Sequence, residues 1–341
     1  MYGTEDQLQM ICIYCLEDLP SNGFRGTEHV IPESLGVFEN NLTLNGVVCD
    51  GCNQLFGDTI DLMLGRGSSE AVHRLNYGAQ PPEKALHLRR DRVRFAFKSE
   101  DSWDGLLLEL RPEAGSLAVQ PIPQVGFWTQ PEGPFVFVSE EELLRIDTPL
   151  PTGVDAANGM LLVADSDTTQ QRLIGALSVR GISFREERRA PIPVRPGELL
   201  PVEVRSRLDL LVLRCVAKIA LNYLALAEGR DFVLGESFCP LRRLVRLGAR
   251  APYPLVVVDD LPILADDDQP RLRQTNGHLI TVGWAADRRS LVAQVGLFNH
   301  ARYRISLARD YSGLWRPIRH GHHFNIETRR VETLVASSLA T

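Results

Sequence analysis

Two pairs of cysteines near the start of the chain constrain its fold more than any other feature. Each pair has two residues between its members, as Cys12-x-x-Cys15 and Cys49-x-x-Cys52. A CxxC turn presents two sulfurs to one metal ion, and a second such turn completes a tetrahedron of thiolates. Because all four positions are cysteines, no coordination position stays open for a substrate. The sequence therefore predicts a structural Zn²⁺ site made of four cysteines.

The composition is that of a globular chain. Of 341 residues, 44% are hydrophobic and 23% are charged, close to the average for soluble domains. No apolar run reaches the roughly 18 residues of a membrane span, and residues 1–9 lack the basic and apolar regions of a signal peptide. We therefore expect a cytoplasmic protein with no membrane partner. In a reducing compartment, paired cysteines favour metal binding over disulfides.

Polar residues lie between the cysteine pairs and directly after the second one. Glu28 and His29 open the segment EHVIP, which is typical of a strand end that leads into a loop. Adjacent side chains on a strand point to opposite faces, so both serve one site only where the strand twists. Asn53 follows Cys52 at the start of an amphipathic run over 52–64, so we expect it in the first turn of a helix. Asn45, followed by glycine, predicts a tight turn before the second pair.

Together these segments resemble the zinc-knuckle subgroup of the HNH endonuclease family. The resemblance covers residues 10–64. The matching segments are CIYC at 12–15, EHVIP at 28–32, NGVVCDGCN at 45–53 and FGDTID at 56–61. It implies a ββα-metal fold, in which a short hairpin and a helix surround one divalent cation, and an enzyme that hydrolyses phosphodiester bonds.

The resemblance also implies roles for individual residues. His29 becomes the general base, which suits an imidazole that titrates near neutral pH. Glu28 and Asn53 become the protein ligands of a catalytic Mg²⁺ or Mn²⁺, and their oxygens are hard donors that suit such a cation. The residue that orients the base maps to Asn45, with Asn41 as the competing candidate. Glu28 and Asn53 stand where many family members have Asp and His.

The charge is unevenly distributed along the chain. The net charge is −6, but residues 1–75 hold eleven acidic and three basic residues, whereas 271–330 hold eleven arginines and three acidic residues. Binding to DNA depends on Lys and Arg beside phosphates, so the acidic first segment is a poor DNA binder alone. We expect arginines elsewhere to contact the phosphates, either in 271–330 or at 242–250, unless they are simply solvated.

For the whole chain we expect an α+β fold. An N-terminal ββα-metal (HNH) module with bound zinc is followed by a larger α+β domain, which has a buried central helix and antiparallel strands. We place the HNH nuclease domain with its four-cysteine zinc site at 1–75 and a recognition or regulatory region at 76–341. The central helix is predicted at 207–228, where the sequence is apolar almost all round.

One face of the predicted central helix is polar. Arg214, Lys218 and Asn222 follow one another at steps of four residues, which places them on the same face. Two interpretations stay open. The three residues receive a phosphate or another small anion, or they form a satisfied buried polar network.

From these observations we predict a metal-dependent HNH endonuclease that hydrolyses DNA phosphodiester bonds. A nuclease joined to a large second region is the layout of restriction-type and anti-phage (antiviral) defence enzymes, which is an analogy of architecture alone. Two alternatives stay open: a non-catalytic, zinc-stapled nucleic-acid-binding protein, and a nuclease gated by a small anionic, nucleotide-like activator bound in the C-terminal region. A homodimer would supply the two active sites that a double-strand break in one event requires.

Overall fold

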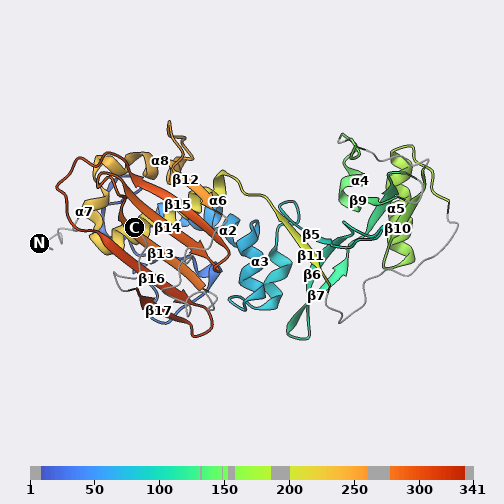
Figure 1. Ribbon diagram of the computed structural model, residues 1–341, viewed down its shortest axis with the longest axis horizontal. Coiled ribbons are helices and arrows are strands. Elements are labelled where there is room, and N and C mark those ends of the chain that lie inside the picture. Colours follow the sequence, from blue (N-terminus) through green and yellow to red (C-terminus); the bar gives the residue numbers. More distant parts are fainter. Residues whose placement is uncertain are drawn as a thin grey trace, which may run out of the picture. The chain divides into compact units, whose positions relative to one another are not determined.

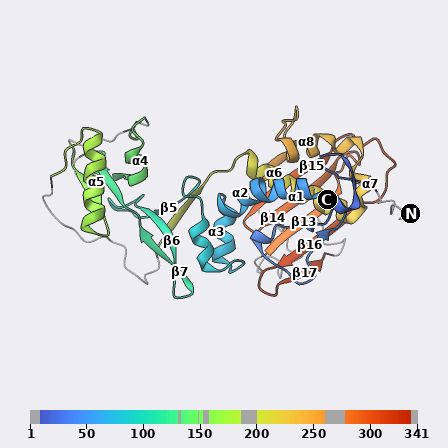
Figure 2. The same cartoon turned by 180° about the vertical axis from the view of Figure 1, so that it is seen from behind.

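The computed structural model describes residues 9–130, 133–147, 149–152, 158–185, 200–259 and 277–334. The chain forms two compact units. The first combines Met1–Gln80 with Leu208–Thr341, and the second is Pro81–Arg207. Figures 1 and 2 show their helices and strands from two sides. The predicted α+β architecture with antiparallel sheets and one buried apolar helix is confirmed.

The division by contacts differs from the predicted division at residue 75 into two consecutive regions. The first break, at Gln80, lies close to the predicted boundary, but residues from Leu208 onward belong to the same unit as the N-terminal segment. The reason is one continuous apolar core, which contains Phe56 from the N-terminal segment, Ile219 and Val295. Contacts between residues so far apart along the chain leave no mark on local composition.

The N-terminal segment consists of two short hairpins and a bent helix. Strands β1 (Gln9–Ile11) and β2 (Asp18–Pro20) pair, as do β3 (Glu28–His29) and β4 (Thr43–Leu44). Helix α1 (Asp50–Phe56) continues through a π-helical turn, η3 (Gly57–Asp61), into α2 (Leu62–Arg66), and α3 (Ser69–Asn76) follows. One stripe of this helix is apolar and buried, which explains its position against the core: Phe56, Ile60, Met63 and Leu64.

Helix α6 (Leu210–Glu228) is the predicted central helix. Its N-cap, Asp209, accepts hydrogen bonds from the backbone N–H groups of Leu211 and Val212, and Gly229, at φ +91°, ends it. By length and composition α6 would reach across a membrane, but 67% of the apolar window is buried inside the protein. That burial is typical of a core helix. Short helices α7 (Arg230–Val233) and α8 (Cys239–Leu247) follow it.

The C-terminal segment is a six-stranded antiparallel sheet in the order β12-β15-β14-β13-β16-β17. The strands are β12 (Val256–Asp259), β13 (Gly277–Trp284), β14 (Leu291–Leu297), β15 (Ala301–Ala308), β16 (Arg319–Asn325) and β17 (Arg330–Thr333). Neighbouring residues across β13, β14 and β15 form a buried apolar face, for example Ile280, Val295 and Tyr303. The alternate residues Thr281, Gln294 and Arg304 are on the more exposed face.

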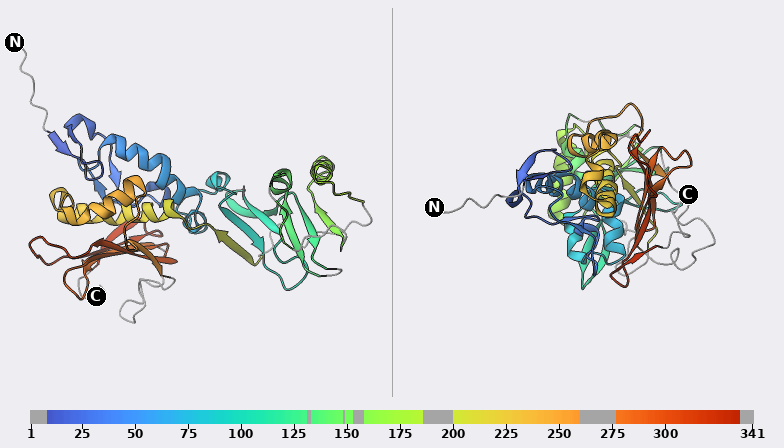
Figure 3. Two further views of the ribbon diagram at one scale, coloured as in Figure 1. Left: turned by 90° about the horizontal axis from the view of Figure 1, so that it is seen from above. Right: turned by 90° about the vertical axis from the view of Figure 1, so that its left-hand side faces the viewer.

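Helix α6 is the middle layer of this unit. It contacts η3, α2 and β4 of the N-terminal segment and also strands β12 to β15. Figure 3 (left) shows the three layers, with the N-terminal segment in blue, α6 to α8 in yellow and orange, and the sheet in red. The N-terminal segment therefore rests on a helix that lies about 150 residues further along the chain.

The second unit holds two smaller sheets. One has the order β11-β5-β6-β7, formed by β5 (Val93–Phe97), β6 (Leu107–Glu113), β7 (Ser116–Pro121) and β11 (Val202–Ser206). The other has the order β10-β8-β9, formed by β8 (Gln124–Trp128), β9 (Phe135–Ser139) and β10 (Met160–Val163). Helices α4 (Glu140–Leu144) and α5 (Asp167–Val179) pack on the latter through a separate core that includes Phe127, Leu143 and Leu173.

Candidate active site and metal centre

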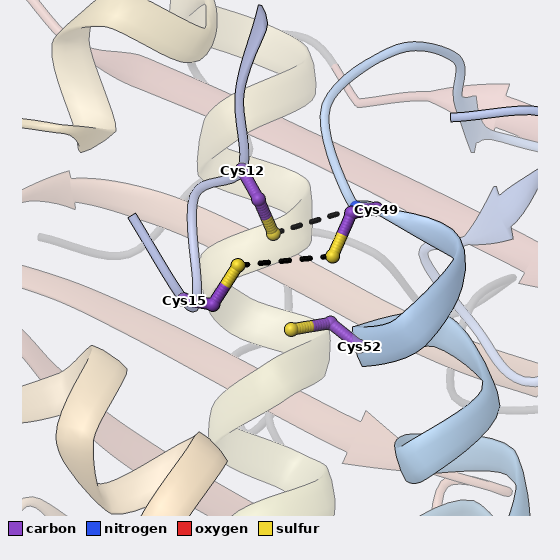
Figure 4. Close-up of side chains that lie close together, drawn as sticks. All are labelled: Cys12, Cys15, Cys49 and Cys52. Carbon is purple, nitrogen blue, oxygen red and sulfur yellow. Dashed lines mark hydrogen bonds between the residues drawn. The ribbon is translucent and has the colours of Figure 1, made fainter. Parts of the chain in front are cut away.

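The four predicted zinc ligands lie together. Cys12 and Cys15 belong to the turn between β1 and β2, and Cys49 and Cys52 stand at the start of α1. Their sulfur atoms all lie within 4.8 Å of one another, and the Sγ atoms of Cys15 and Cys49 are 3.7 Å apart (Figure 4). A tetrahedron with Zn–S bonds of 2.3 Å has edges of about 3.8 Å. The cluster therefore fits a tetrahedral zinc ion.

The surroundings shift the pKa values of the thiols in opposite directions: that of Cys12 is lowered, whereas burial raises that of Cys15 and the hydrogen bond with Cys12 raises that of Cys52. A hydrogen bond with Cys52 lowers the pKa of the Cys12 thiol to about 4, against the opposing effect of burial, and the backbone N–H of Cys49 donates to the same sulfur at 3.4 Å. Arg246 on α8 hydrogen bonds to Cys52, and this contact raises the pKa of the guanidinium. Zn²⁺ with four thiolates carries a net charge of −2, which a nearby arginine partly compensates.

Strand β3 places its two residues on opposite sides, as expected from the alternation of a strand. Glu28 is 2% exposed, whereas the side chain of His29 is 25% exposed. The register pairs Glu28 with Leu44 and His29 with Thr43 on β4. On one face of this hairpin Glu28 packs into the core, and on the other face the imidazole of His29 is partly exposed to solvent.

Asn41 is the residue that contacts the imidazole. Its Nδ2 lies 2.9 Å from His29 Nδ1. Asn45, to which the sequence assigned the orienting role, is exposed and accepts a hydrogen bond from Thr27 Oγ1 at 3.3 Å. The competing candidate from the sequence is therefore the neighbour of His29, because the loop after β3 returns past the ring before β4 begins.

The amide of Asn41 also bears on the tautomer of His29. In the described part of the chain, Asn41 Oδ1 is buried and has no hydrogen-bond partner. A half-turn of the amide places Oδ1 opposite Nδ1 and lets the ring N–H donate to it, which satisfies the oxygen. In that tautomer Nε2 is unprotonated and can accept a proton. Without the half-turn, Asn41 Nδ2 donates to Nδ1 and the ring carries its proton on Nε2, which lies 3.2 Å from Glu33 Oε1.

Glu28 is held by two residues of α6. Its Oε1 accepts hydrogen bonds from Lys218 Nζ at 2.6 Å and from Asn222 Nδ2 at 2.9 Å. Lys218 also forms an ion pair with Asp61 Oδ2 at 2.7 Å, and Tyr14 donates its hydroxyl hydrogen to Asn222 Oδ1 at 2.7 Å. Lys218 and Asn222 therefore belong to a satisfied buried network, which is one of the two interpretations of their spacing.

The third residue of that polar face has a separate role. Arg214 Nε donates to the carbonyl oxygen of Val245 at 3.0 Å, and its Nη2 donates to that of Arg246 at 2.9 Å. These carbonyls belong to the last turn of α8, where helix carbonyls lack partners. Arg214 thus caps α8 and joins it to α6, and in the structure it does not line a site together with Lys218.

Burial and charge act against each other in the network. Burial raises the pKa of Glu28, and the charge of Lys218 opposes that shift. Burial alone would lower the pKa of Lys218, but the charges of Asp61 and Glu28 raise it above its ordinary value. The ammonium group therefore stays charged, and one buried cation is shared between two carboxylates, of which Glu28 is almost fully buried and Asp61 is 18% exposed.

Asn53 lies in the first turn of α1, as predicted, next to the zinc cluster. Its Nδ2 donates to the carbonyl oxygen of Thr27 at 3.3 Å, directly before β3. Among the described residues, nothing hydrogen bonds to Asn53 Oδ1 or to Glu28 Oε2. Each residue is thus anchored through one polar atom and keeps one oxygen, and both are hard donors of the kind Mg²⁺ prefers.

A divalent cation at these two oxygens would need further ligands. In the described part of the chain, the four cysteines are the only group of three or more His, Cys, Asp or Glu side chains placed to hold a metal ion. Water and phosphate oxygens of a substrate are the usual additional ligands of Mg²⁺. The donor chemistry of the two residues therefore suits a cation whose other ligands are water molecules, some of which phosphate oxygens of a substrate can replace.

Some residues of the site escaped the sequence analysis. Tyr14 and Asp61 lie in the matching segments CIYC and FGDTID, but the resemblance gives them no role. Cys215, whose Sγ donates to Asp61 Oδ1 at 3.1 Å, lies in the apolar central helix. The available signal was Lys218, a single lysine inside an otherwise apolar helix. A buried lysine requires a buried acid, but the sequence does not say which one.

Comparison with known proteins identifies the N-terminal segment. Residues 12–68 match the family model described as HNH endonuclease. The match includes both cysteine pairs, the β3–β4 hairpin and α1, and the four-cysteine cluster in this region is consistent with a zinc-knuckle member. No curated protein and no solved structure matches the chain.

Proposed function

Because residues 12–68 belong to the HNH endonuclease family, we propose that this protein is a metal-dependent endonuclease that hydrolyses phosphodiester bonds of DNA. The observation that carries the proposal is the contact of 2.9 Å between Asn41 and Nδ1 of the half-exposed His29. It supplies an oriented imidazole in the segment that also holds two oxygen donors: Glu28, on the opposite side of the same strand, and Asn53, whose amide donates to the backbone just before it. The family mechanism implies products with a 5′-phosphate and a 3′-hydroxyl.

His29 acts as the general base in this proposal. Its Nε2 takes a proton from a water molecule, which then attacks the phosphorus atom. Asn41 holds the ring through Nδ1, so the orientation of Nε2 is fixed before substrate binds. The imidazolium that forms is stabilised by Glu33, whose Oε1 lies 3.2 Å from Nε2. The four cysteines lie apart from the reacting atoms; a zinc ion held by them would fix α1 and thus Asn53.

Glu28 Oε2 and Asn53 Oδ1 are the atoms that would hold Mg²⁺ or Mn²⁺. When bound, such a cation supplies charge neutralisation at the phosphate and at the leaving 3′-oxygen. Glu28 remains buried and tied to α6 through Oε1, and Asn53 remains tied to the backbone of Thr27. These hydrogen bonds hold the two oxygens in fixed positions, so the two side chains reorganise little during the reaction.

The experiment is nicking of supercoiled plasmid by wild type and by His29→Ala, each with Mg²⁺, Mn²⁺ or EDTA. We expect cation-dependent nicking by wild type and a rate lower by about 10²- to 10⁴-fold for the variant, the usual contribution of a general base. His87→Ala, at an exposed histidine in the second unit, is the control. Equal rates for wild type and His29→Ala, or nicking in EDTA, would contradict the proposal.

The proposal also includes a restriction-type or anti-phage role, a homodimer and a small anionic activator. The buried network around Lys218 limits where such an activator could bind. Lys218 is enclosed between Glu28 and Asp61, so an anion at this lysine would have to displace two carboxylates. An activator would therefore have to bind elsewhere in the C-terminal region. Retained DNA binding without cleavage under any condition would instead favour the non-catalytic alternative.

A further inference from the structure

The contact between α6 and the N-terminal segment is apolar except for one polar cluster. Lys218 and Asn222, one turn apart on α6, are 1% and 0% exposed. Both donate to the same atom, Oε1 of Glu28. Two donors on a single carboxylate oxygen fix the rotation of the carboxylate plane. The remaining oxygen, Oε2, is thereby directed by residues that lie outside the HNH motif.

Stability alone is a poor reason for such a cluster. Burying a lysine and two carboxylates carries a large desolvation cost for each ion, and apolar residues of similar volume are often as stable or more so. The neighbouring positions of α6 are apolar, for instance Ala217, Ile219 and Leu221, so an apolar contact would suit this helix. The polar residues occur where α6 meets the carboxylate next to His29.

The helix of the N-terminal segment departs from regular geometry at the same place. Residues 57–61 form a π-helical turn, and its last residue, Asp61, is the second partner of Lys218. Such wide turns shift the side chains that follow and are frequent at functional sites. The charges of Asp61 and Glu28 both keep Lys218 protonated. The ammonium group contacts both carboxylates and holds them in place.

We propose that Lys218 and Asn222 are positioning residues of the active site, which hold Glu28 through Oε1 so that Oε2 faces the divalent cation. This proposal rests on the proposed function above and deepens it: the cation site of the HNH module depends on α6. Neither residue touches substrate. Both lie outside residues 12–68, the part of the chain that matches the family.

The test measures binding of Mn²⁺ by electron paramagnetic resonance on the zinc-loaded full chain, together with the Mg²⁺ dependence of plasmid nicking. Two pairs of variants separate positioning from folding. Tyr14→Phe with Asn222→Leu is compared with Tyr14→Phe alone, because the leucine would otherwise leave the Tyr14 hydroxyl without its close acceptor. Lys218→Met with Asp61→Asn is compared with Asp61→Asn alone. The double variant keeps the net charge that the cluster has in the wild type, but Glu28 loses its cation.

We expect each double variant to bind Mn²⁺ about 10- to 100-fold more weakly than its single-variant control, the usual effect of losing a residue that orients a metal ligand. The Mg²⁺ concentration for half-maximal nicking should rise by the same factor, while nicking at saturating Mg²⁺ changes little. Zinc content should match that of the control, and unfolding should remain cooperative in every variant.

Equal Mn²⁺ affinities within both pairs would overturn the positioning role, whatever the nicking rates are. Absence of Mn²⁺ binding to the wild type would overturn it as well, because there would be no cation to face. Failure of the proposed function has a different signature: the wild type binds Mn²⁺ and the double variants bind it more weakly, but no protein nicks DNA.

Discussion

Two adjacent residues of the proposed site, Glu28 and His29, lie on opposite faces of one strand. Glu28 points into the protein, where Lys218 and Asn222 hold it, and His29 points outward to Asn41. A strand of two residues in a two-stranded hairpin has little stability of its own. The contacts on both faces compensate, so the geometry of the base depends on buried and exposed neighbours together.

The first prediction concerns the residue that orients His29. We expect Asn41→Ala to lower the nicking rate by roughly 10- to 100-fold, since a misplaced reacting group costs rates of this order. Asn45→Ala should change it less than about twofold, because Asn45 contacts Thr27 and not the imidazole. Rates of plasmid nicking at saturating Mg²⁺ check both variants. The reverse order would return the orienting role to Asn45.

The sequence predicted these residues to different degrees. The spacing of the cysteines specified the cluster, since each CxxC turn is local. The roles of His29, Glu28 and Asn53 stay predictions from the family resemblance. The choice between Asn41 and Asn45 depended on the path of a loop, and the partner of Lys218 depended on packing between distant segments. Neither is encoded by local pattern.

At the scale of elements, β13 is joined to the N-terminal segment by a buried histidine. His278 Nε2 lies 3.3 Å from the carbonyl oxygen of Leu35, and its Nδ1 accepts from the backbone N–H of Phe298 at 3.3 Å. Burial lowers the pKa of His278 to about 3. The folded chain therefore holds a neutral ring, which carries its proton on Nε2.

This histidine predicts a pH dependence of stability. The unfolded chain takes up a proton at His278 near pH 6.5, whereas the folded chain does so only near pH 3. Between these values the unfolded state binds more protons, so stability falls as the pH falls below about 6.5. His278→Gln keeps one donor and one acceptor but does not titrate. We expect its Tm to fall less between pH 7.5 and 5 than that of wild type; parallel curves would refute the assignment.

The zinc knuckle gives a prediction about metal removal. Cys49→Ser should abolish stoichiometric zinc binding and lower the free energy of unfolding by about 3 kcal/mol or more, because zinc binds the folded cluster and stabilises it. Cys239→Ser is the matched control, since Cys239 lies outside the cluster. Elemental analysis and thermal unfolding measure both effects. Unchanged zinc content in Cys49→Ser would show that the four cysteines are not one site.

In the whole molecule, the HNH module has no hydrophobic core of its own among the residues that the structure describes. Its apolar residues share one core with α6 and the C-terminal sheet, and its Glu28 is neutralised by α6. We therefore expect an isolated fragment of residues 1–80 to lack a cooperative unfolding transition. A chain in which a Gly/Ser linker replaces 81–207 should keep both the transition and its zinc, since these residues form a separate unit.

Circular dichroism and zinc analysis on the two shortened chains check this prediction. Cooperative unfolding of the fragment at the Tm of the full chain would show that α6 contributes nothing to the module. The sequence predicted the fold class because helices and strands have local periodicity. The sequence predicted a single boundary, at residue 75. It did not predict that the chain returns to the first unit at Leu208, because that return depends on long-range contacts.

Resealing of the nicked plasmid by DNA ligase tests directly whether this protein hydrolyses DNA through His29. Ligase closes a nick only when it bears a 5′-phosphate and a 3′-hydroxyl, the ends that hydrolysis at the HNH site should leave. We predict that wild type with Mg²⁺ produces nicks that ligase reseals without prior treatment of the ends, and that His29→Ala produces almost none. Nicks that cannot be resealed, or an equal yield from His29→Ala, would contradict the account.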